Sequence, residues 1–422
     1  MTNNVVELLK QTVHLLYVNG QTTQRVVDDT KKLAYALGCS IELMPQWNVV
    51  FLSYTFDRNA KSAWQTEIIQ SHPSGVDMNK VAKTSQLIDE ICHHTGGLTE
   101  ALIEQWHLKL KSIAQLQPSS HARFILMCGA GAAALGMIFG VSDVYSLTLI
   151  FISAALGAVT RRLIARQSTN LFIQPLVAAA VAGLVALFAR RYFTGINLQL
   201  VELAPCMILV PGAHILNALL DLVRGRLTLG LARSFYAVLI LFAISTGLIA
   251  VLSFGSGSID LSVPIGQTTL AVDVLSAGVA VAAFGAFFSI PWRLLFVPVL
   301  VGMLCHASRW FLEDAGLSVE FATFFACLVA GCATTVLSKY LKLPFAALAF
   351  ASVVSMMPGF FVFKFASALI DIFNAGGQAT VGLISSSIAY FIAATLIVFL
   401  MALGLILPKM LFDGYYEKRK DA

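Results

Sequence analysis

Ten long apolar stretches occupy this chain from Phe124 onward, and they constrain its fold more than any other feature. A helix needs roughly 20 apolar residues to cross the hydrocarbon core of a bilayer, and each stretch is close to that length. The expected spans are residues 123–140, 144–160, 171–189, 201–220, 232–254, 268–290, 292–308, 319–338, 343–371 and 380–408. Hydrophobic residues make up 58% of the 422 residues and charged residues only 12%, which excludes a soluble globular protein. We therefore expect an α-helical polytopic membrane protein.

The first part of the chain differs from the rest, because residues 1–120 are mixed and polar. Hydrophobic spacing predicts helices at 5–18, 21–37, 78–93 and 98–115, with strands at 39–43, 49–54 and 63–69. The chain starts without a basic segment followed by an apolar core, so no cleavable signal peptide is expected. These features predict a small α/β domain that stays in the cytoplasm.

Five spans in each half is an odd number, so the second half enters the membrane with the opposite orientation to the first. We expect an inverted 5+5 repeat with modules at 121–256 and 266–410, followed by a cytoplasmic tail at 411–422. With residue 1 inside, the cytoplasmic connections and tail hold thirteen Lys and Arg residues, whereas the outside loops hold Arg190, Arg191 and Arg309. This asymmetry follows the positive-inside rule and accounts for the net charge of +5 without a nucleic-acid partner. Both termini are expected in the cytoplasm of a bacterial inner-membrane protein.

Two proline–glycine breaks interrupt apolar sequence at matching places, at 209–212 (Leu-Val-Pro-Gly) and 356–359 (Met-Met-Pro-Gly). Proline removes a backbone donor inside a helix and glycine loosens the chain, so in a membrane such breaks line a cavity or are buried in protein. Gly183 and Gly331 precede the two prolines by 28 and 27 positions, which indicates an internal repeat. In transporters, repeats of this kind place the substrate site at their interface near the bilayer midplane.

The residues around the two breaks are the expected substrate site. Helix N-termini attract anions, so half-helices starting at Gly212 and Gly359 can hold a carboxylate, while the preceding half-helix ends offer carbonyls to an amine. The expected substrate-binding residues are Pro211, Gly212, His214, Asn217, Pro358, Gly359 and Lys364. Lys364 is a basic side chain inside an expected span, which is costly and therefore a functional candidate, with snorkelling to the outer surface as the alternative.

Three residues are expected to take part in proton coupling. His214 titrates near neutral pH, although a histidine bonded to a neighbouring carbonyl is an equal alternative. Asp273 lies inside the sixth span, with a carboxylate at headgroup level as the alternative. Asp221, near Arg224 and Arg226, is also explained by a loop salt bridge or a gate.

The sequence predicts no cofactor, no metal site and no enzymatic activity. Cys92, His93 and His94 are adjacent on an expected helix, where neighbouring side chains diverge by about 100° and do not converge on one ion. No nucleophile elbow, P-loop or HExxH motif is present. A hydrolase housed in the first 120 residues is therefore a weak alternative.

Short segments along nearly the whole chain resemble the threonine/serine exporter family. They are Gly20, 36–38 and 48–51 in the N-terminal domain, 209–212, Asn217 and 224–233 (Arg-Gly-Arg-Leu-Thr-Leu-Gly-Leu-Ala-Arg) in the first module, and 291–293, 302–306 and 357–359 in the second. The motifs are short, but their order over three segments makes the resemblance specific. In some relatives the two membrane modules are separate proteins, whereas this chain carries both.

The resemblance implies an inner-membrane exporter of L-threonine and L-serine that is energised by the proton motive force. Its partners would be the amino acid, protons and the lipid bilayer, and homo-oligomer formation is left open. Export of C4-dicarboxylates such as succinate is one alternative, since it is proposed for some relatives. A channel or sensor gated by the cytoplasmic domain is another.

Overall fold

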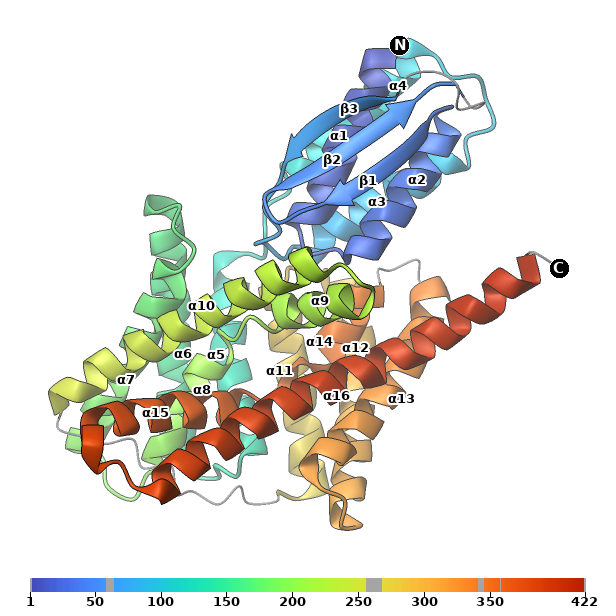
Figure 1. Ribbon diagram of the computed structural model, residues 1–422. Helices are drawn as coiled ribbons and strands as arrows, with labels where there is room; N and C mark the ends of the chain where they lie inside the picture. The colour runs from blue at the N-terminus through green and yellow to red at the C-terminus, as the bar shows by residue number, and fades with distance from the viewer. Residues whose placement is uncertain (1, 58–63, 256–267, 341–344, 357, 421–422) are drawn as a thin grey trace.

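The computed structural model describes residues 2–57, 64–255, 268–340, 345–356 and 358–420, and it is mostly helical (Figure 1). Eight described helices are long and apolar enough to cross a membrane. They are α5 (His121–Ile138), α6 (Val144–Gln167), α7 (Ile173–Tyr192), α10 (Leu227–Leu252), α11 (Leu270–Phe287), α12 (Trp292–Asp314), α13 (Val319–Tyr340) and α16 (Val381–Lys420). The bent pair α8 (Leu198–Met207) and α9 (Gly212–Val223) would make a ninth span. The prediction of a polytopic membrane protein is thus confirmed.

The N-terminal region, residues 2–114, combines a small sheet with four helices. Strands β1 (Ser40–Pro45), β2 (Val49–Thr55) and β3 (Gln65–Gln70) form an antiparallel sheet in the order β1-β2-β3. The helices are α1 (Thr2–Val18), α2 (Thr23–Ala36), α3 (Met78–Cys92) and α4 (Glu100–Ala114), and they cover one face of the sheet (Figure 1). The helices and strands predicted in this region are present, although residue 63 of the third predicted strand lies outside the described residues.

Alternation along β2 explains which face of the sheet the helices cover. Val50, Leu52 and Tyr54 are buried, and Ile69 on β3 joins them. Their side chains point to the same face because successive residues of a strand point to opposite faces. They pack in one cluster with residues of the helices, including the fully buried Trp106 of α4. This gives the N-terminal region a hydrophobic core of its own.

The two proline–glycine breaks interrupt helices at the places where the sequence predicts them. At the first break, α8 and α9 meet at an angle of 56°. The carbonyl of Met207, which Pro211 cannot bond, accepts a hydrogen bond from the Val210 amide at 3.3 Å. At the second break, α14 (Phe345–Val353) and the short 3-10 turn η2 (Val354–Met356) precede α15 (Gly359–Ala375), with Met357 outside the described residues.

Helices of the two halves pack in the same pairs. Helix α5 contacts α6 as α11 contacts α12, α7 contacts α10 as α13 contacts α16, and α9 contacts α10 as α15 contacts α16. The close approaches also match. A Cβ on Gly183 would lie 3.1 Å from the Leu248 carbonyl oxygen of α10, and one on Gly331 would lie 2.9 Å from the Leu405 carbonyl oxygen of α16. Small residues let both helix pairs approach closely, as is common in membranes.

The N-terminal region lies against one end of the helix bundle, next to α9 and the start of α10 (Figure 1). The Met78 amide donates a hydrogen bond to the Phe288 carbonyl at 2.9 Å. Met78 also belongs to the hydrophobic core of the bundle, and the Trp47 ring packs at a tilt against Tyr236 of α10 with ring centroids 5.0 Å apart. The two parts therefore share a packed interface.

Candidate functional site

The two breaks meet inside the bundle. A Cβ added to Gly359, the first residue of α15, would lie 3.5 Å from Cγ of Met207 and 3.8 Å from Cγ2 of Val210. These are ordinary van der Waals distances, so the second break rests directly on the first. Met207 and Gly359, which are 152 positions apart in sequence, are thereby brought into one site.

The first break opens into the larger of two cavities that flank this contact, with a volume of about 770 Å³, which we call the first cavity. Pro211, Gly212 and His214 line it, as the sequence predicts for a site at this break. Basic side chains predominate in its wall, and a loop of the N-terminal region at 74–77 completes it. The Arg, His and Asp residues that line it are Arg161, Arg162, Arg166, His121, His214 and Asp77. A small anion would find a favourable field here.

Two of the three arginines of the first cavity are held against aromatic rings. The Arg161 guanidinium lies 4.5 Å from the ring centroid of Phe287, and that of Arg162 lies 4.3 Å from the ring centroid of Phe124. Arg162 also donates a hydrogen bond to the Ser119 carbonyl. Stacking of this kind is attractive and leaves the edge of a guanidinium open to an acceptor.

The second break opens into a cavity of about 310 Å³, which we call the second cavity. Pro358, Ser355 and Asp273 line it, together with an ion pair between Arg309 and Glu313 at 2.7 Å. Acidic side chains outnumber basic ones in this wall, with Asp273 and Glu313 against Arg309, whereas arginines predominate in the first cavity.

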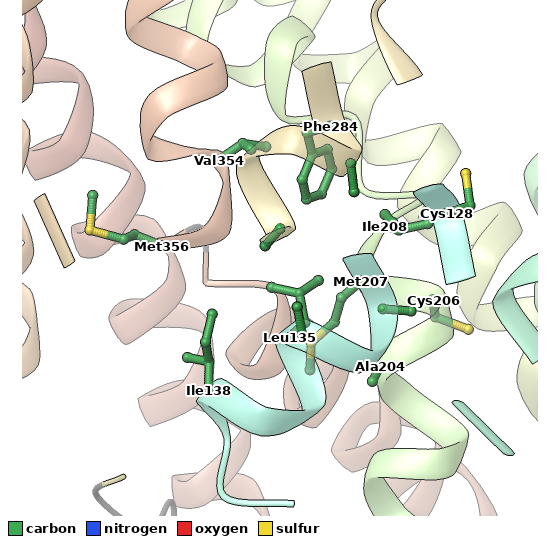
Figure 2. Packing of buried hydrophobic residues seen from close by; sticks show 14 of the residues in the cluster. Cys128, Leu135, Ile138, Ala204, Cys206, Met207, Ile208, Phe284, Val354 and Met356 are labelled. Carbon is green, nitrogen blue, oxygen red and sulfur yellow. The ribbon is translucent and has the colours of Figure 1, made fainter. Parts of the chain in front are cut away.

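A thin apolar layer separates the two cavities. We call Leu135, Met207, Val210, Phe284 and Val354 the central barrier. They enclose a void of about 10 Å³, about the space of one water molecule. Figure 2 shows Met207 beside Leu135, with Phe284 and Val354 across the same space. Val210 also lines the first cavity, so the barrier begins where the first cavity ends.

The barrier also borders the second cavity, because Phe139 and Ser355 line both the small void and that cavity. The first cavity, the void and the second cavity therefore follow one another through the bundle at the crossing of the breaks.

A buried hydrogen-bonded chain links Asp273 to the second break. His306 Nδ1 lies 3.1 Å from Asp273 Oδ2, and His306 Nε2 lies 2.9 Å from Ser355 Oγ in η2. His306 is 1% exposed, so water does not compete for these bonds. An ionised Asp273 can only accept, which fixes the imidazole proton on Nδ1 and leaves Nε2 to accept from the serine hydroxyl. A proton taken up by Asp273 therefore changes the bonding at the break.

His306 and Ser355 were not predicted as site residues. The available signal was a histidine inside an apolar span, where a polar side chain is costly and needs a partner. Nothing in the sequence indicates that His306 meets Asp273, which lies 33 residues earlier on another helix.

Asn217 and Asp221 lie on the side of α9 that faces the N-terminal region. The Asn217 amide donates to the Gly20 carbonyl at 3.4 Å. Asp221 accepts from the Thr23 hydroxyl at 2.9 Å and pairs with Arg233 at 2.9 Å, both partners being 2% exposed. Both side chains therefore lie at the interface between the N-terminal region and the helix bundle.

Asp221 has a second arginine partner in Arg226, at 3.5 Å. Arg226 in turn donates to the Gln24 side chain at 2.6 Å. The salt bridge expected as an alternative for Asp221 is present, and it reaches into the N-terminal region. The predicted roles of Asn217 and Asp221 in substrate binding and proton coupling stay predictions.

Two further predicted residues have other neighbours. The His214 ring packs edge-on against Tyr236, with centroids 5.1 Å apart, at the wall of the first cavity. Lys364 Nζ lies 5.2 Å from the ring centroid of Tyr390 on α16. Lys364 therefore faces a neighbouring helix of its own half.

The Cys92, His93 and His94 side chains diverge in the structure. His93 Nδ1 bonds to the Asp89 carbonyl at 2.7 Å, and the His94 ring packs against Trp106. Within the described ranges, no three His, Cys, Asp or Glu residues are arranged to hold a metal ion.

Comparison with known proteins gives matches over both membrane modules. The family profile described as "Putative threonine/serine exporter" matches residues 8–255, and that described as "Threonine/Serine exporter, ThrE" matches residues 273–411. A "Probable threonine/serine exporter" of Mycobacterium tuberculosis is 24% identical over 393 residues, which cover 89% of this chain and 72% of that protein. No solved structure matches this chain.

A second relative is an uncharacterised protein of Haemophilus influenzae, 27% identical over 220 residues, or 52% of this chain and 72% of that protein. The first family profile alone spans more than half of the chain, and the second matches the rest of the membrane helices. The resemblance seen in the sequence is confirmed, and the family points to transport and away from enzymatic activity. This multi-pass membrane protein belongs to the threonine/serine exporter family.

Proposed function

We propose that this protein is a secondary active exporter of L-threonine and L-serine that exchanges them for protons. The observation that carries the proposal is the pair of cavities at the two helix breaks, separated by the central barrier. Only the few side chains of the central barrier lie between a substrate in the first cavity and the second cavity. Family membership supports the amino-acid substrate.

The proposed transport cycle is alternating access by an inverted 5+5 repeat of ten spans. Matching helix pairs and the matching glycine contacts of Gly183 and Gly331 support the repeat. In this scheme one repeat rocks against the other, so that the central barrier opens toward one cavity at a time. Movement at the break between α8 and α9 would open or close the first cavity, and movement at the break between α14 and α15 would open or close the second.

The first cavity is proposed to face the cytoplasm of a bacterial inner membrane. The arginines at 161, 162 and 166 line it on the side of the N-terminal region, whereas Arg309 lines the second cavity. Basic residues concentrate on cytoplasmic ends of membrane proteins, so this distribution supports a cytoplasmic N-terminal region. The C-terminal end of α16 points toward the same side (Figure 1).

Protons are proposed to act at the second break. Asp273 lines the second cavity, and through His306 it is bonded to Ser355, next to Pro358. Protonation of Asp273 from the outside would let its carboxyl donate to His306 Nδ1, which moves the imidazole proton to Nε2 and reverses the direction of the bond to Ser355. This would favour movement of α15, whose first residue Gly359 rests on the first break.

Efflux from proteoliposomes tests the proposal. Purified protein would be reconstituted in vesicles loaded with radiolabelled L-threonine, L-serine or succinate, with and without an inward proton gradient. Gradient-stimulated efflux of the two amino acids is expected. Efflux of succinate alone would reassign the substrate to dicarboxylates, and no efflux of any of the three would contradict the exporter and favour a sensor.

A further inference from the structure

The N-terminal region contributes directly to the wall of the first cavity. Residues 74–77 of the loop between β3 and α3 line it together with helix α6, which carries the arginines. Asp77 is the one carboxylate among the described residues that line this cavity. The cavity thus has a basic wall from the bundle and an acidic group from the N-terminal region.

Asp77 is fixed in place by several contacts. Its amide donates to the Asn19 carbonyl at 3.1 Å, and the next amide, of Met78, donates to Phe288 of the bundle. The loop is packed so closely that a Cβ at Gly75 would lie 2.8 Å from the Val18 carbonyl oxygen. The position of the carboxylate is therefore set by both parts of the protein.

The Asp77 carboxylate keeps one oxygen available. Oδ1 accepts from the amides of Asn79 and Lys80, both at 3.1 Å, which makes Asp77 the N-cap of α3. The Lys80 ammonium is turned away and donates to the Ala114 carbonyl at 2.9 Å. Among the described residues no hydrogen bond to Oδ2 is found, although the side chain is 9% exposed. A carboxylate oxygen at the wall of a cavity favours a cationic partner.

Arg161 offers the complementary group. Its guanidinium is held over the Phe287 ring, and no carbonyl or carboxylate within the described part of the chain accepts a hydrogen bond from it. A guanidinium in this setting fits a carboxylate, and the N-terminus of α9 at Gly212 adds positive potential to the same cavity.

We infer that the first cavity is a binding site for the zwitterionic head group of an α-amino acid, with Arg161 holding the carboxylate and Asp77 the ammonium. This inference rests on the proposed function and extends it, because the N-terminal region becomes part of the substrate site. Asp77 then selects amino acids over acids that lack an ammonium, which the basic wall alone would accept.

Equilibrium binding to the full-length purified protein tests the inference. Isothermal titration would compare L-threonine with 3-hydroxybutyrate, which has the same carboxylate and hydroxyl groups but no ammonium. The wild type is expected to prefer threonine by about tenfold to hundredfold, the range of a hydrogen bond to a charged group. Asp77→Asn is expected to lose this preference by weakening threonine alone. Arg161→Gln is expected to weaken both ligands by the same factor.

Folding is controlled within the same experiment. Asparagine caps a helix about as well as aspartate, so Asp77→Asn keeps the start of α3, and Asp77→Ser provides a second capping variant. Asp143→Asn is the matched control, because Asp143 caps α6 through the Ser146 amide at 2.7 Å and does not line the cavity. It should bind both ligands as the wild type does.

Three results would overturn the inference. They are threonine preference retained in both Asp77 variants, binding unchanged in Arg161→Gln, and a wild type that binds neither ligand or both equally. Efflux from proteoliposomes separates these results from failure of the proposed function. Wild-type efflux of threonine with unchanged Asp77 variants would leave the exporter in place and remove only this site.

Discussion

The first and second cavities are built on the same kind of proline–glycine break, yet their chemistry differs. The first has arginines from α6 and a wall from the N-terminal region. The second has Asp273 in a hydrogen-bonded chain to the break, and an Arg309–Glu313 ion pair. One is suited to hold a carboxylate, and the other to take up a proton.

This difference teaches how a repeated scaffold can separate two tasks. Matching helix pairs put a broken helix at the centre of each half, and the two breaks touch through Gly359 and Met207. Because the breaks are in contact, a movement of one would displace the other directly, without residues in between. In the proposed mechanism, coupling of substrate and proton then needs only different side chains around the two breaks.

The largest expected effect is at the second cavity. Asp273→Asn keeps a hydrogen-bonding side chain for His306 but cannot take up a proton. We expect efflux of threonine to fall to the level seen without a proton gradient, while exchange at equal pH continues. Glu313→Gln is the matched control, since Glu313 lines the same cavity outside the hydrogen-bonded chain. Full gradient stimulation in Asp273→Asn would assign proton coupling to another group.

The next effect tests the buried Asp221–Arg233 ion pair, which lies beside the N-terminal region. Asp221→Ala leaves Arg233 buried without its carboxylate, a change that costs about 3–5 kcal/mol. We expect a lower unfolding temperature of the full-length protein, measured by tryptophan fluorescence in detergent. Combining Asp221→Ala with Arg233→Leu should recover part of the loss, because no charge is then left unpaired. Equal stability of the wild type and Asp221→Ala would contradict a structural role for this ion pair.

A smaller effect tests whether the two halves share one scaffold. Gly183→Ala and Gly331→Ala each force a Cβ against the backbone of a partner helix, which costs about 1–3 kcal/mol by overpacking. Similar losses of unfolding temperature are expected in both. Gly157→Ala is the control, because its Cβ would lie 3.5 Å from the Ala178 carbonyl oxygen, an ordinary contact. A large loss in one half alone would weaken the repeat.

The smallest expected effect is a pH dependence of threonine binding at the first cavity. Burial raises the pKa of Asp77, so this carboxylate takes up a proton at a higher pH than an ordinary aspartate. The protonated form cannot pair with an ammonium, and threonine affinity should therefore fall a few-fold as pH decreases through this pKa. His121 and His214 also line this cavity, so the effect is taken as the difference between the wild type and Asp77→Asn. Identical pH profiles of the two would contradict it.

The sequence predicts much of the fold because local patterns determine it. Of the ten spans expected from apolar length, eight are found among the described helices, or nine with the bent pair α8 and α9. Alternation gives β2, and the spacing of Val5, Leu8 and Leu9, which are all buried, gives α1. Proline and glycine have strong local effects, so both breaks are found where the sequence places them. Features of this kind can be read without knowledge of neighbours in space.

The site is less predictable because it depends on contacts between distant residues. Asp273 was predicted as a site residue because a carboxylate inside an apolar span is energetically costly. Its contact with His306, however, follows only from the packing of α11 on α12. Arg161 resembles any loop arginine in sequence. The side of α9 that carries Asn217 faces the N-terminal region, which no spacing argument could indicate.

The central claim is that the two breaks separate during transport, and a reversible cross-link tests it most directly. A Cβ at Gly359 would lie 3.9 Å from the Met207 Cβ, which is disulfide geometry. The pair Met207→Cys and Gly359→Cys would be made in a background without the seven native cysteines. Oxidation is expected to stop threonine efflux and reduction to restore it, with single-cysteine variants unaffected. Complete cross-linking with undiminished efflux would show that the breaks do not part.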